Sequence, residues 1–600
     1  MALGYRWRMT SAIVTTIVAA VFQLAIPQLL GEAVDNALGF LGGAEATADE
    51  ARSALVTVAG LLFGAAVLRG VFTMVHNYFG ESIGQHMGYE LRMQFYRKLQ
   101  RMSFSYHNHV HTGDLMTRGM LDIEGVRLFV NTALIRTLLL AILIGAGAYL
   151  LISTDVVLGL ISLSFVPIVA WRAIVARLRL MSGWKTLQEK LSILTRVMDE
   201  NLAGIRVVRA FAGQQYELKK FNRSSDEAQA LANDLIGIRV RNTTVMTFVF
   251  LASVVLTLWV GGLKVIDGQL TVGDLTKFIA FMFILQMPVR QLGMMVNGFA
   301  RAQTSGTRLF EILDLESVIK EIPDAKPLQV TDGILRFEEV EFAFKDEFGD
   351  DQILKDISFE ARPGHTVGIV GPPGSGKSTL AHLIPRFYDV TGGRITIDGQ
   401  DIRDVELESL RHVVGVVQQD TFMFTSSIEN NVAYGDPWAE TETIQRATSQ
   451  AQLHDWIRRM PRGYETLVGE RGVSLSGGQR QRLSIARSLL LRPRVMVFDD
   501  STAAIDAATE QRIRAALKEV TKERATIIIS HRLSSLMHAD EILFLEKGEI
   551  VERGTHEELI SGGGRYKDLY ELQIRPGDDA LRHLRASKAD LKREDGLHGE

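Results

Sequence analysis

Apolar stretches with few or no charged residues recur through the first half of the chain. They are residues 11–31, 54–79, 137–153, 156–170, 242–263 and about 278–299. A helix of about 20 apolar residues crosses a bilayer. Backbone groups in hydrocarbon must bond within their own segment, so the pattern predicts six membrane-spanning helices. The third and fourth stretches are separated only by Thr154 and Asp155, so a buried hairpin is the alternative there.

The distribution of basic residues around these stretches predicts their orientation. The connections 80–136 and 171–241 are rich in Lys and Arg, whereas the short loops after the first, third and fifth stretches contain few. Basic residues remain on the cytoplasmic side, so the N-terminus and both long connections are expected in the cytoplasm. A signal peptide is the alternative for residues 11–31, but this stretch is longer than a normal signal h-region.

The two long connections carry helical apolar periodicity over residues 81–101 and 177–221, with charged residues on the opposite face. We expect these segments to continue the membrane helices into the cytoplasm by about 25 Å or more, at 1.5 Å per residue. Helices of that length need a cytoplasmic partner to contact.

The second half of the chain has a different composition, with Gly-rich loops and charged segments of helical character. A length of 600 residues predicts more than one domain. We expect a membrane domain over residues 1–310, a linker over 311–330, an α/β domain over 331–572 and a charged, weakly helical or disordered tail over 573–600. The net charge of −4 gives no sign of nucleic-acid binding, and the absence of cysteine excludes disulfides and thiolate zinc sites.

A phosphate-binding motif lies in the second half. Residues 371–378 read GPPGSGKS and fit G-x-x-x-x-G-K-[ST], between an apolar run at 365–370 and a helical run from 379. Glycines there let backbone N–H groups surround phosphates at a helix N-terminus, while the lysine reaches the β- and γ-phosphates and the serine hydroxyl holds Mg²⁺. The predicted ATP-binding residues are Gly371, Pro372, Pro373, Gly374, Ser375, Gly376, Lys377, Ser378 and Thr379.

Two further segments extend this site. Residues 495–499, VMVFD, form an apolar strand that ends in Asp499, as expected of the carboxylate that supports Mg²⁺. Before it, residues 475–479 read LSGGQ and are followed by the helix-like segment 480–488. With these motifs the chain resembles the ATP-binding cassette (ABC) superfamily, in which LSGGQ is the signature. The resemblance implies that the signature residues contact the ATP bound to the phosphate loop of a facing cassette. They are Leu475, Ser476, Gly477, Gly478 and Gln479.

The resemblance spans about residues 10–572 and implies roles for single residues. Phe344 takes the place of the aromatic residue, usually Tyr, that stacks on adenine, and Gln419 that of the glutamine that senses Mg²⁺, with Gln418 as the rival assignment. Asp506 is similar to the D-loop aspartate, and His531 fits the histidine that contacts the γ-phosphate. Residues 468–472 look like the X-loop of exporters. Residues 112–115 with Asp122, and residues 200–211, match segments that flank or form the coupling helices.

Position 500 departs from the family pattern. The family places Glu after the strand that ends in Asp499, as the base that positions water, and this chain has Asp500. The shorter side chain withdraws the carboxylate by roughly one C–C bond, and a misplacement near 1 Å can cost about 10²-fold in rate. Asp500, His531 and Lys377 are the predicted catalytic residues. The substitution predicts a heterodimer with one slow and one fast ATP site, and the alternative is a homodimer in which Asp500 is a mediocre base.

The resemblance implies ATP- and Mg²⁺-dependent export across the cytoplasmic membrane, by a half-transporter that pairs with a second one. An amphipathic drug, lipid or peptide is the expected substrate. An ATP-gated channel, a membrane-bound regulator and an importer are the alternatives. Arg69, His76 and Asn77 in the second stretch are candidate cavity residues, because polar groups inside a membrane generally face protein or water. Arg69 can equally pair across helices, and an interfacial role is the alternative for His76 and Asn77.

Overall fold

The structure is a computed structural model that describes residues 5–41, 48–129, 134–346, 349–469, 472, 475–500 and 521–573. The chain divides into two compact units. The first contains Met1–Arg101 and Val110–Glu316, and the second contains Met102–His109 and Ser317–Glu600. A short segment from between the first long helices therefore belongs to the second unit. The predicted charged tail, residues 573–600, lies almost entirely outside the described residues.

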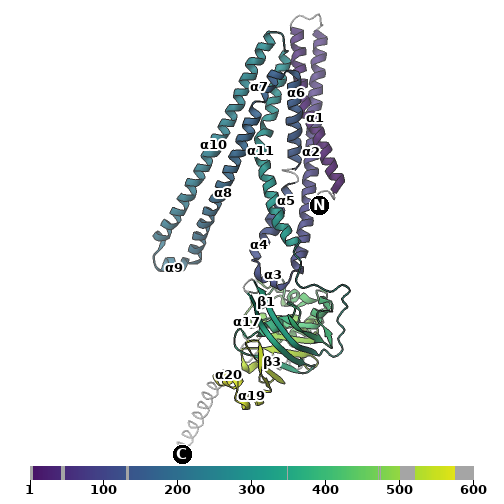
Figure 1. Cartoon of the computed structure of the whole chain (residues 1–600), viewed down its shortest axis with the longest axis vertical. Helices are drawn as coiled ribbons and strands as arrows, with labels where there is room; N and C mark the ends of the chain where they lie inside the picture. Colours follow the sequence, from purple (N-terminus) through teal and green to yellow (C-terminus); the bar gives the residue numbers. More distant parts are fainter. Residues whose placement is uncertain are drawn as a thin grey trace, which may run out of the picture. The chain divides into compact units, whose positions relative to one another are not determined.

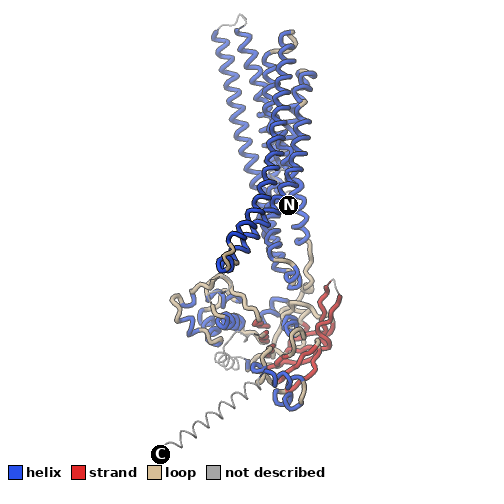
Figure 2. Tube along the Cα trace, turned by 90° about the vertical axis from the view of Figure 1, so that its left-hand side faces the viewer, coloured by secondary structure: helices blue, strands red, loops and turns tan. Residues whose placement is uncertain are grey.

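The first unit consists of long helices that run side by side (Figures 1 and 2). They are α1 (Arg6–Leu41), α2 (Ala48–Arg101), α6 (Arg136–Thr154), α7 (Val156–Leu163), α8 (Phe165–Ala203), α10 (Gln214–Ile266) and α11 (Val272–Leu313), with the short α4 (Thr112–Thr117), α5 (Ile123–Leu128) and α9 (Ile205–Ala210) between them. Within the described residues, six helical segments are long and apolar enough to cross a membrane, with α7 and α8 together forming the fourth. This confirms the six predicted spans.

Asp155 separates the third span from the fourth. Its backbone is extended, with φ −153°, and its side chain accepts a hydrogen bond from the backbone N–H of Leu158, which caps the N-terminus of α7. The ammonium of Lys264 on α10 lies 2.5 Å from the other carboxylate oxygen. The chain therefore turns at Asp155 because the side chain replaces a backbone acceptor that the helix would otherwise supply.

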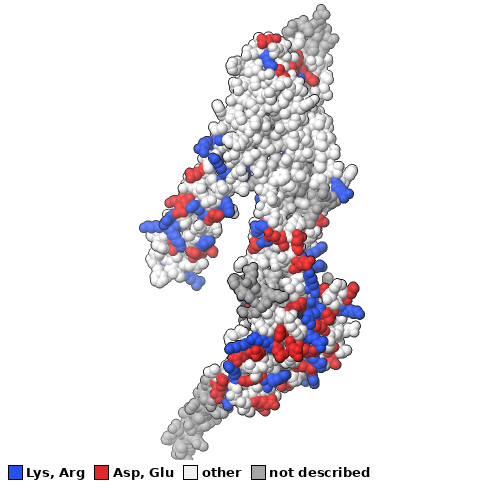
Figure 3. Space-filling view, viewed as in Figure 1, with Lys and Arg blue, Asp and Glu red and all other residues white. Residues whose placement is uncertain are grey.

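The outer surface of the bundle is apolar. At most 33% of the residues in each apolar window are buried inside the chain, so most of their side chains face outward. On the face shown in Figure 3, charged side chains gather near the ends of the helices and are scarce along their middle. The interior is packed by aromatic and aliphatic residues such as Phe165 and Phe250, whose ring centroids lie 5.2 Å apart in an edge-to-face contact. These features suit a bundle with hydrocarbon around it.

Five of these helices, α1, α2, α8, α10 and α11, are longer than a bilayer is thick, and the two long connections are built from three of them. Helix α2 has 54 residues, α8 has 39 and α10 has 53. At 1.5 Å per residue a 53-residue helix is about 80 Å long, against about 30 Å of hydrocarbon. The polar segments predicted to continue the spans are therefore helical extensions of them, and α9 joins α8 to α10 at the far end of the second extension.

The second unit contains two β-sheets. The antiparallel sheet has the order β2-β1-β4-β5, with β1 (Leu335–Asp346), β2 (Gly349–Ala361), β4 (Gly392–Ile397) and β5 (Gln400–Asp401). The other sheet has the order β10-β9-β3-β8-β7-β6, with β3 (Thr366–Val370), β6 (Val414–Val417), β7 (Val495–Asp499), β8 (Ala525–Ile529), β9 (Glu541–Glu546) and β10 (Glu549–Gly554). Strands β6, β7, β8, β3 and β9 are parallel, and β10 is an antiparallel edge.

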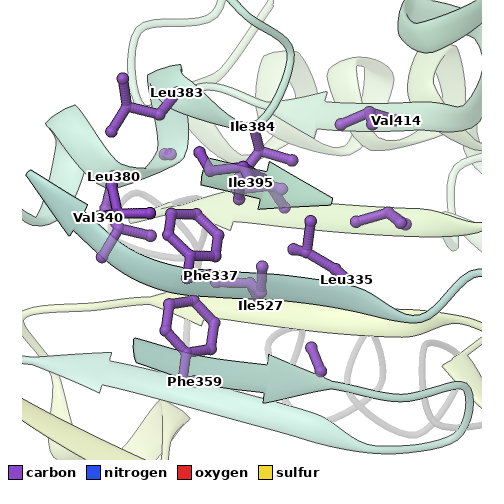
Figure 4. Packing of buried hydrophobic residues seen from close by; sticks show 14 of the residues in the cluster. Leu335, Phe337, Val340, Phe359, Leu380, Leu383, Ile384, Ile395, Val414 and Ile527 are labelled. Carbon is purple, nitrogen blue, oxygen red and sulfur yellow. The ribbon is translucent and has the colours of Figure 1, made fainter. Parts of the chain in front are cut away.

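One hydrophobic core joins the two sheets. Phe337 of β1 stacks on Phe359 of β2 at 4.5 Å, and Leu380 and Ile527 belong to the same buried cluster (Figure 4). Around the sheets lie α12 (Lys377–Leu383), α13 (Leu407–Val413), α19 (His556–Gly562) and α20 (Arg565–Gln573). A second buried cluster holds together a helical lobe of α14 (Ile428–Val432), α15 (Thr441–Gln450), α16 (His454–Arg458) and α17 (Gly477–Leu490). This confirms the predicted α/β domain.

Candidate functional site

In the loop between β3 and α12, Gly376 is required by its backbone conformation and Gly371 by lack of space. Gly376 has φ +101°, and a Cβ there would also lie 2.7 Å from the side chain of Leu354. A Cβ on Gly371 would lie 2.0 Å from the carbonyl oxygen of Leu545. The strand, loop and helix follow one another as the phosphate-binding motif predicts, with α12 beginning at Lys377.

Lys377 lies inside this loop. It is buried, and its Nζ atom donates hydrogen bonds to the carbonyl oxygens of Gly371 at 3.0 Å and Pro372 at 2.8 Å. Burial lowers the pKa of the Lys377 ammonium, and the nearby carboxylates of Asp499 and Asp500 act in the opposite direction. The loop thus holds one cation at its centre, where the motif places the phosphates of ATP.

Ser378 and Asp499 lie side by side at the carboxyl end of β7. The Ser378 hydroxyl donates to Asp499 Oδ1 at 3.3 Å, and Asp499 is 5% exposed. Burial raises the pKa of the Asp499 carboxyl, although His382 and the Ser378 hydrogen bond oppose the shift. A hydroxyl next to a carboxylate is the kind of oxygen pair that Mg²⁺ takes from a protein while substrate phosphates supply further ligands. The two residues therefore fit the predicted Mg²⁺ site.

Asp500 occupies a constrained position next to them. Its φ is +42°, which is rare for a residue with a side chain. Its Oδ1 atom accepts hydrogen bonds from the Ser530 hydroxyl at 3.3 Å and from the backbone N–H of His531 at 3.4 Å, and the residue is 8% exposed. The carboxylate is thus bound to the end of β8. Asp500 and His531, which lie 31 positions apart, are brought together, and the contact is made by the main chain of His531.

Other predicted residues are exposed at the same edge of the sheet or lie outside the described residues. Gln418 and Gln419 both follow β6 and are exposed, so the Mg²⁺-sensing role of Gln419 stays a prediction. The His531 side chain is also exposed. Asp506 lies outside the described residues, as does part of the predicted X-loop, residues 470 and 471.

The signature segment forms the N-terminus of α17. Ser476 is the N-cap of this helix, and it exchanges hydrogen bonds with Gln479: the Ser476 hydroxyl accepts from the Gln479 N–H, and the Ser476 N–H donates to Gln479 Oε1 at 2.8 Å. Leu475 is buried and anchors the segment in the core of the helical lobe. Ser476 itself is exposed, and the backbone N–H groups of Gly477 and Gly478, the first two residues of the helix, lie too early for an acceptor within the helix. The segment therefore presents hydrogen-bond donors outward.

Phe344 lies on β1 in an aromatic cluster. Its ring contacts Tyr388 edge-to-face at 5.3 Å and Phe342 at 4.9 Å. Tyr388 also accepts a hydrogen bond from the Asn108 side-chain amide at 2.9 Å. Asn108 belongs to α3 (Phe104–His109), the short helix that packs in the second unit. Phe344, the predicted adenine platform, is therefore linked to Asn108 of α3 through the Tyr388 side chain.

Helix α3 has a second contact with the sheet domain. Phe104 stacks on Phe387 with centroids 4.3 Å apart and an interplanar angle of 16°. The predicted coupling segment 112–115 follows α3, and there Asp114 pairs with Arg118 and Arg308 inside the first unit. The sequence analysis missed α3, Phe387 and Tyr388. The signal available was the aromatic pair at 387–388, directly after the helix of the phosphate loop.

The three candidate cavity residues of the membrane unit lie together. Arg69, His76 and Asn77 line a cavity of about 260 Å³ with residues of α1, α6 and α11. Arg136, at the start of α6, also lines it and was missed, because the sequence pattern placed it at the end of a cytoplasmic connection. Arg290 does not line the cavity, and its guanidinium lies 3.4 Å from the Thr247 hydroxyl.

Known proteins match both units. The ABC transporter transmembrane region matches residues 9–289 and the ABC transporter family model matches residues 354–503. The uncharacterized ABC transporter ATP-binding protein YknU of Bacillus subtilis is 39% identical over 509 residues, which are 85% of this chain and 87% of that protein. The putative multidrug export ATP-binding/permease protein YgaD of the same organism is 35% identical over 580 residues, 95% of this chain and 97% of that protein.

Among solved structures, a bacterial Atm1-family ABC exporter with ATP bound has a TM-score of 0.78 and 28% identity, covering 95% of this chain and 98% of that chain. Six spans, a phosphate loop and a signature helix on one chain define an ABC half-transporter, and the chain belongs to the ABC transporter family. It is a multi-pass exporter subunit of the cytoplasmic membrane, with its ATPase domain in the cytoplasm, and such exporters work as dimers.

Proposed function

We propose that this chain exports an amphipathic substrate by alternating access, as one subunit of a heterodimer in which the ATP site at its own phosphate loop is slow. The observation that carries the asymmetric part is Asp500, which stands where the family has Glu and is hydrogen-bonded to the end of β8. Relatives described as putative multidrug exporters support an amphipathic drug as the substrate. Lipids and peptides are the other substrates that this class suggests.

ATP binding follows from the residues around the phosphate loop. The backbone N–H groups of the loop and Lys377 receive the phosphates, and Phe344 offers its ring to adenine. Mg²⁺, which neutralises charge on the phosphate oxygens, would be held by Ser378 and Asp499. The resemblance to the family adds Gln419 as a further Mg²⁺ residue. The ammonium of Lys377 exchanges its bonds to the Gly371 and Pro372 carbonyls for bonds to phosphate, which stabilises the charge of the transition state.

The geometry of Asp500 supports a slow site. A general base must come within hydrogen-bond reach of the attacking water. The Asp500 carboxylate is one C–C bond shorter than that of Glu, about 1.5 Å, and its Oδ1 atom already binds Ser530 and the His531 N–H. The same chain keeps a complete signature, which would serve the phosphate loop of the partner. Hydrolysis is therefore expected chiefly at the site led by the partner's lysine.

Two exposed surfaces of this chain are suited to contact a second half-transporter, which supports the proposed dimer. The N-terminus of α17 presents Ser476 outward, where the phosphates of a facing cassette would meet it. At the α9 end of the long hairpin, Leu202, Val207 and Phe211 are 63%, 61% and 83% exposed. Clustered apolar side chains on an aqueous surface mark a docking site. A partner cassette seated there would receive the motion of the membrane helices.

Export is tested by concentrative uptake into inverted membrane vesicles that contain the full transporter. We expect ATP-dependent accumulation of an amphipathic dye above its external concentration, and at least a tenfold loss with Lys377→Ala, because closure requires ATP in both sites. Lys355→Ala is the matched control, since the Lys355 side chain lies outside the phosphate loop and forms a 3.8 Å ion pair with Glu549. Dissipative dye movement that stops at equal concentrations would identify a channel instead.

Phe104→Ala tests the role of α3. Loss of the stacked pair removes about 1 kcal/mol of contact beyond the buried area. We expect several-fold less transported substrate per ATP hydrolysed, because movement of the second unit would be coupled less tightly to movement of the membrane helices. The ratio of vesicle uptake to phosphate release is the measurement. Phe104→Tyr, which keeps the ring, should retain the ratio, and an unchanged ratio in Phe104→Ala would remove α3 from the pathway.

A further inference from the structure

The cavity in the membrane unit carries positive charge without a compensating carboxylate. It is lined by α1, α2, α6 and α11, and its described lining contains the guanidinium groups of Arg69 and Arg136 but no Asp or Glu. Neither guanidinium makes an ion pair or hydrogen bond with the described residues. Uncompensated charge within a membrane protein is costly, so such arginines normally pair or face a functional pathway.

The same cavity is lined by a buried histidine with one ring nitrogen that is unbonded within the described residues. His76 is 4% exposed, and its Nδ1 atom has no hydrogen-bond partner within the described structure. A buried polar atom left unbonded costs about 1–3 kcal/mol, so it is retained where a bound group supplies the missing bond. The amide side chains of Gln23 and Gln291, from α1 and α11, add further donors on the facing walls.

The rest of the lining is apolar. Leu139, Leu140 and Leu143 of α6 and Met295 of α11 contribute hydrocarbon surface beside the polar cluster. One volume of about 260 Å³ is therefore lined by both charge and hydrocarbon, and α6 contributes to both through Arg136 and its leucines. A ligand that satisfies both kinds of lining needs an anionic head and an apolar body.

We propose that this cavity binds the anionic head of an amphiphile, such as a sulfonate, carboxylate or phosphate ester, through Arg69 and Arg136. The inference rests on the proposed export function and specifies its substrate class. Guanidinium groups form paired hydrogen bonds with such oxyanions, and the two arginines come from α2 and α6, so an anion would join the two helices. A cationic amphiphile of the same length would instead meet two like charges.

The experiment measures binding without hydrolysis. The full-length transporter in phosphatidylcholine nanodiscs is equilibrated with radiolabelled decanesulfonate or decyltrimethylammonium, and binding to protein-free nanodiscs is subtracted. We expect decanesulfonate to bind at least tenfold more tightly than the cation. Arg69→Gln and Arg136→Gln should each weaken sulfonate binding about tenfold, whereas Arg69→Lys, which keeps the charge, should weaken it no more than about threefold.

Arg290→Gln is the matched control, because Arg290 lies on α11 outside the cavity. Equal binding of both probes, or equal losses in Arg290→Gln and Arg69→Gln, would overturn the proposal. Thermal unfolding of each variant separates loss of binding from loss of fold. The same binding assay in phosphatidylglycerol nanodiscs identifies the natural ligand. If the anionic lipid displaces decanesulfonate, the ligand is an anionic lipid; if decanesulfonate stays bound, the ligand is a water-soluble anionic amphiphile. Export of a cationic dye with no sulfonate binding would contradict the anion site but leave the export function intact.

Discussion

Replacing Asp500 with glutamate is expected to raise ATP turnover at the site that contains Lys377 by about ten- to a hundredfold. The substitution extends the carboxylate by one C–C bond, about 1.5 Å, toward the water that attacks the γ-phosphate. The longer side chain can also leave the hydrogen bonds that Asp500 Oδ1 accepts from the Ser530 hydroxyl and the His531 N–H. Phosphate release by the full-length chain, purified alone in nanodiscs, is the direct measurement.

The unmodified chain should hydrolyse ATP slowly in the same assay, since both of its sites would then use Asp500. Asp500→Asn is the matched control, because it keeps the size of the side chain and removes the base. ATP affinity measured in parallel shows whether Glu at this tightly packed position, 8% exposed with φ +42°, preserves the site. Fast, substrate-stimulated hydrolysis by the unmodified chain, with no gain from Asp500→Glu, would establish Asp500 as a competent base and favour the homodimer.

Ser476→Asp is expected to reduce ATP hydrolysis by the assembled transporter by about a hundredfold. Aspartate is as good an N-cap as serine, so α17 keeps its first turn. Its charge, however, would face the phosphates held by the other cassette. Two like charges 4 Å apart repel by about 4 kcal/mol at an effective dielectric constant of 20, and partial screening at this exposed position reduces the effect.

Ser476→Asn separates charge from capping, because asparagine is also a good N-cap and is neutral. We expect it to retain most of the activity that Ser476→Asp loses. In a transporter with one slow and one fast site, Ser476→Asp should reduce hydrolysis more than Lys377→Ala does, since the signature serves the partner's fast site. Equal losses from the two variants would contradict the asymmetry, and full activity in Ser476→Asp would show that the signature of this chain contacts no phosphate.

Single-residue departures from a motif are visible in sequence, but their consequences depend on neighbours that the sequence does not place. Asp500 was recognisable from its position after Asp499. Its hydrogen bonds to Ser530 and His531 arise because β7 and β8 are adjacent parallel strands, paired at Asp499 and Ile529. Likewise, Asn108 and Tyr388 are 280 positions apart and meet only because residues 102–109 pack in the second unit.

The sequence by itself determined the six spans and the ATP-binding loops. Hydrocarbon tolerates only long uncharged helices, and phosphate binding requires closely spaced glycines in one loop whose N–H groups converge at one helix end, so both features are continuous in the chain. Only the tertiary structure decided which helix packs on the sheet domain and that Arg136 joins Arg69 in one cavity. Those features depend on which faces of separate helices meet, and side-chain packing between distant segments sets that choice.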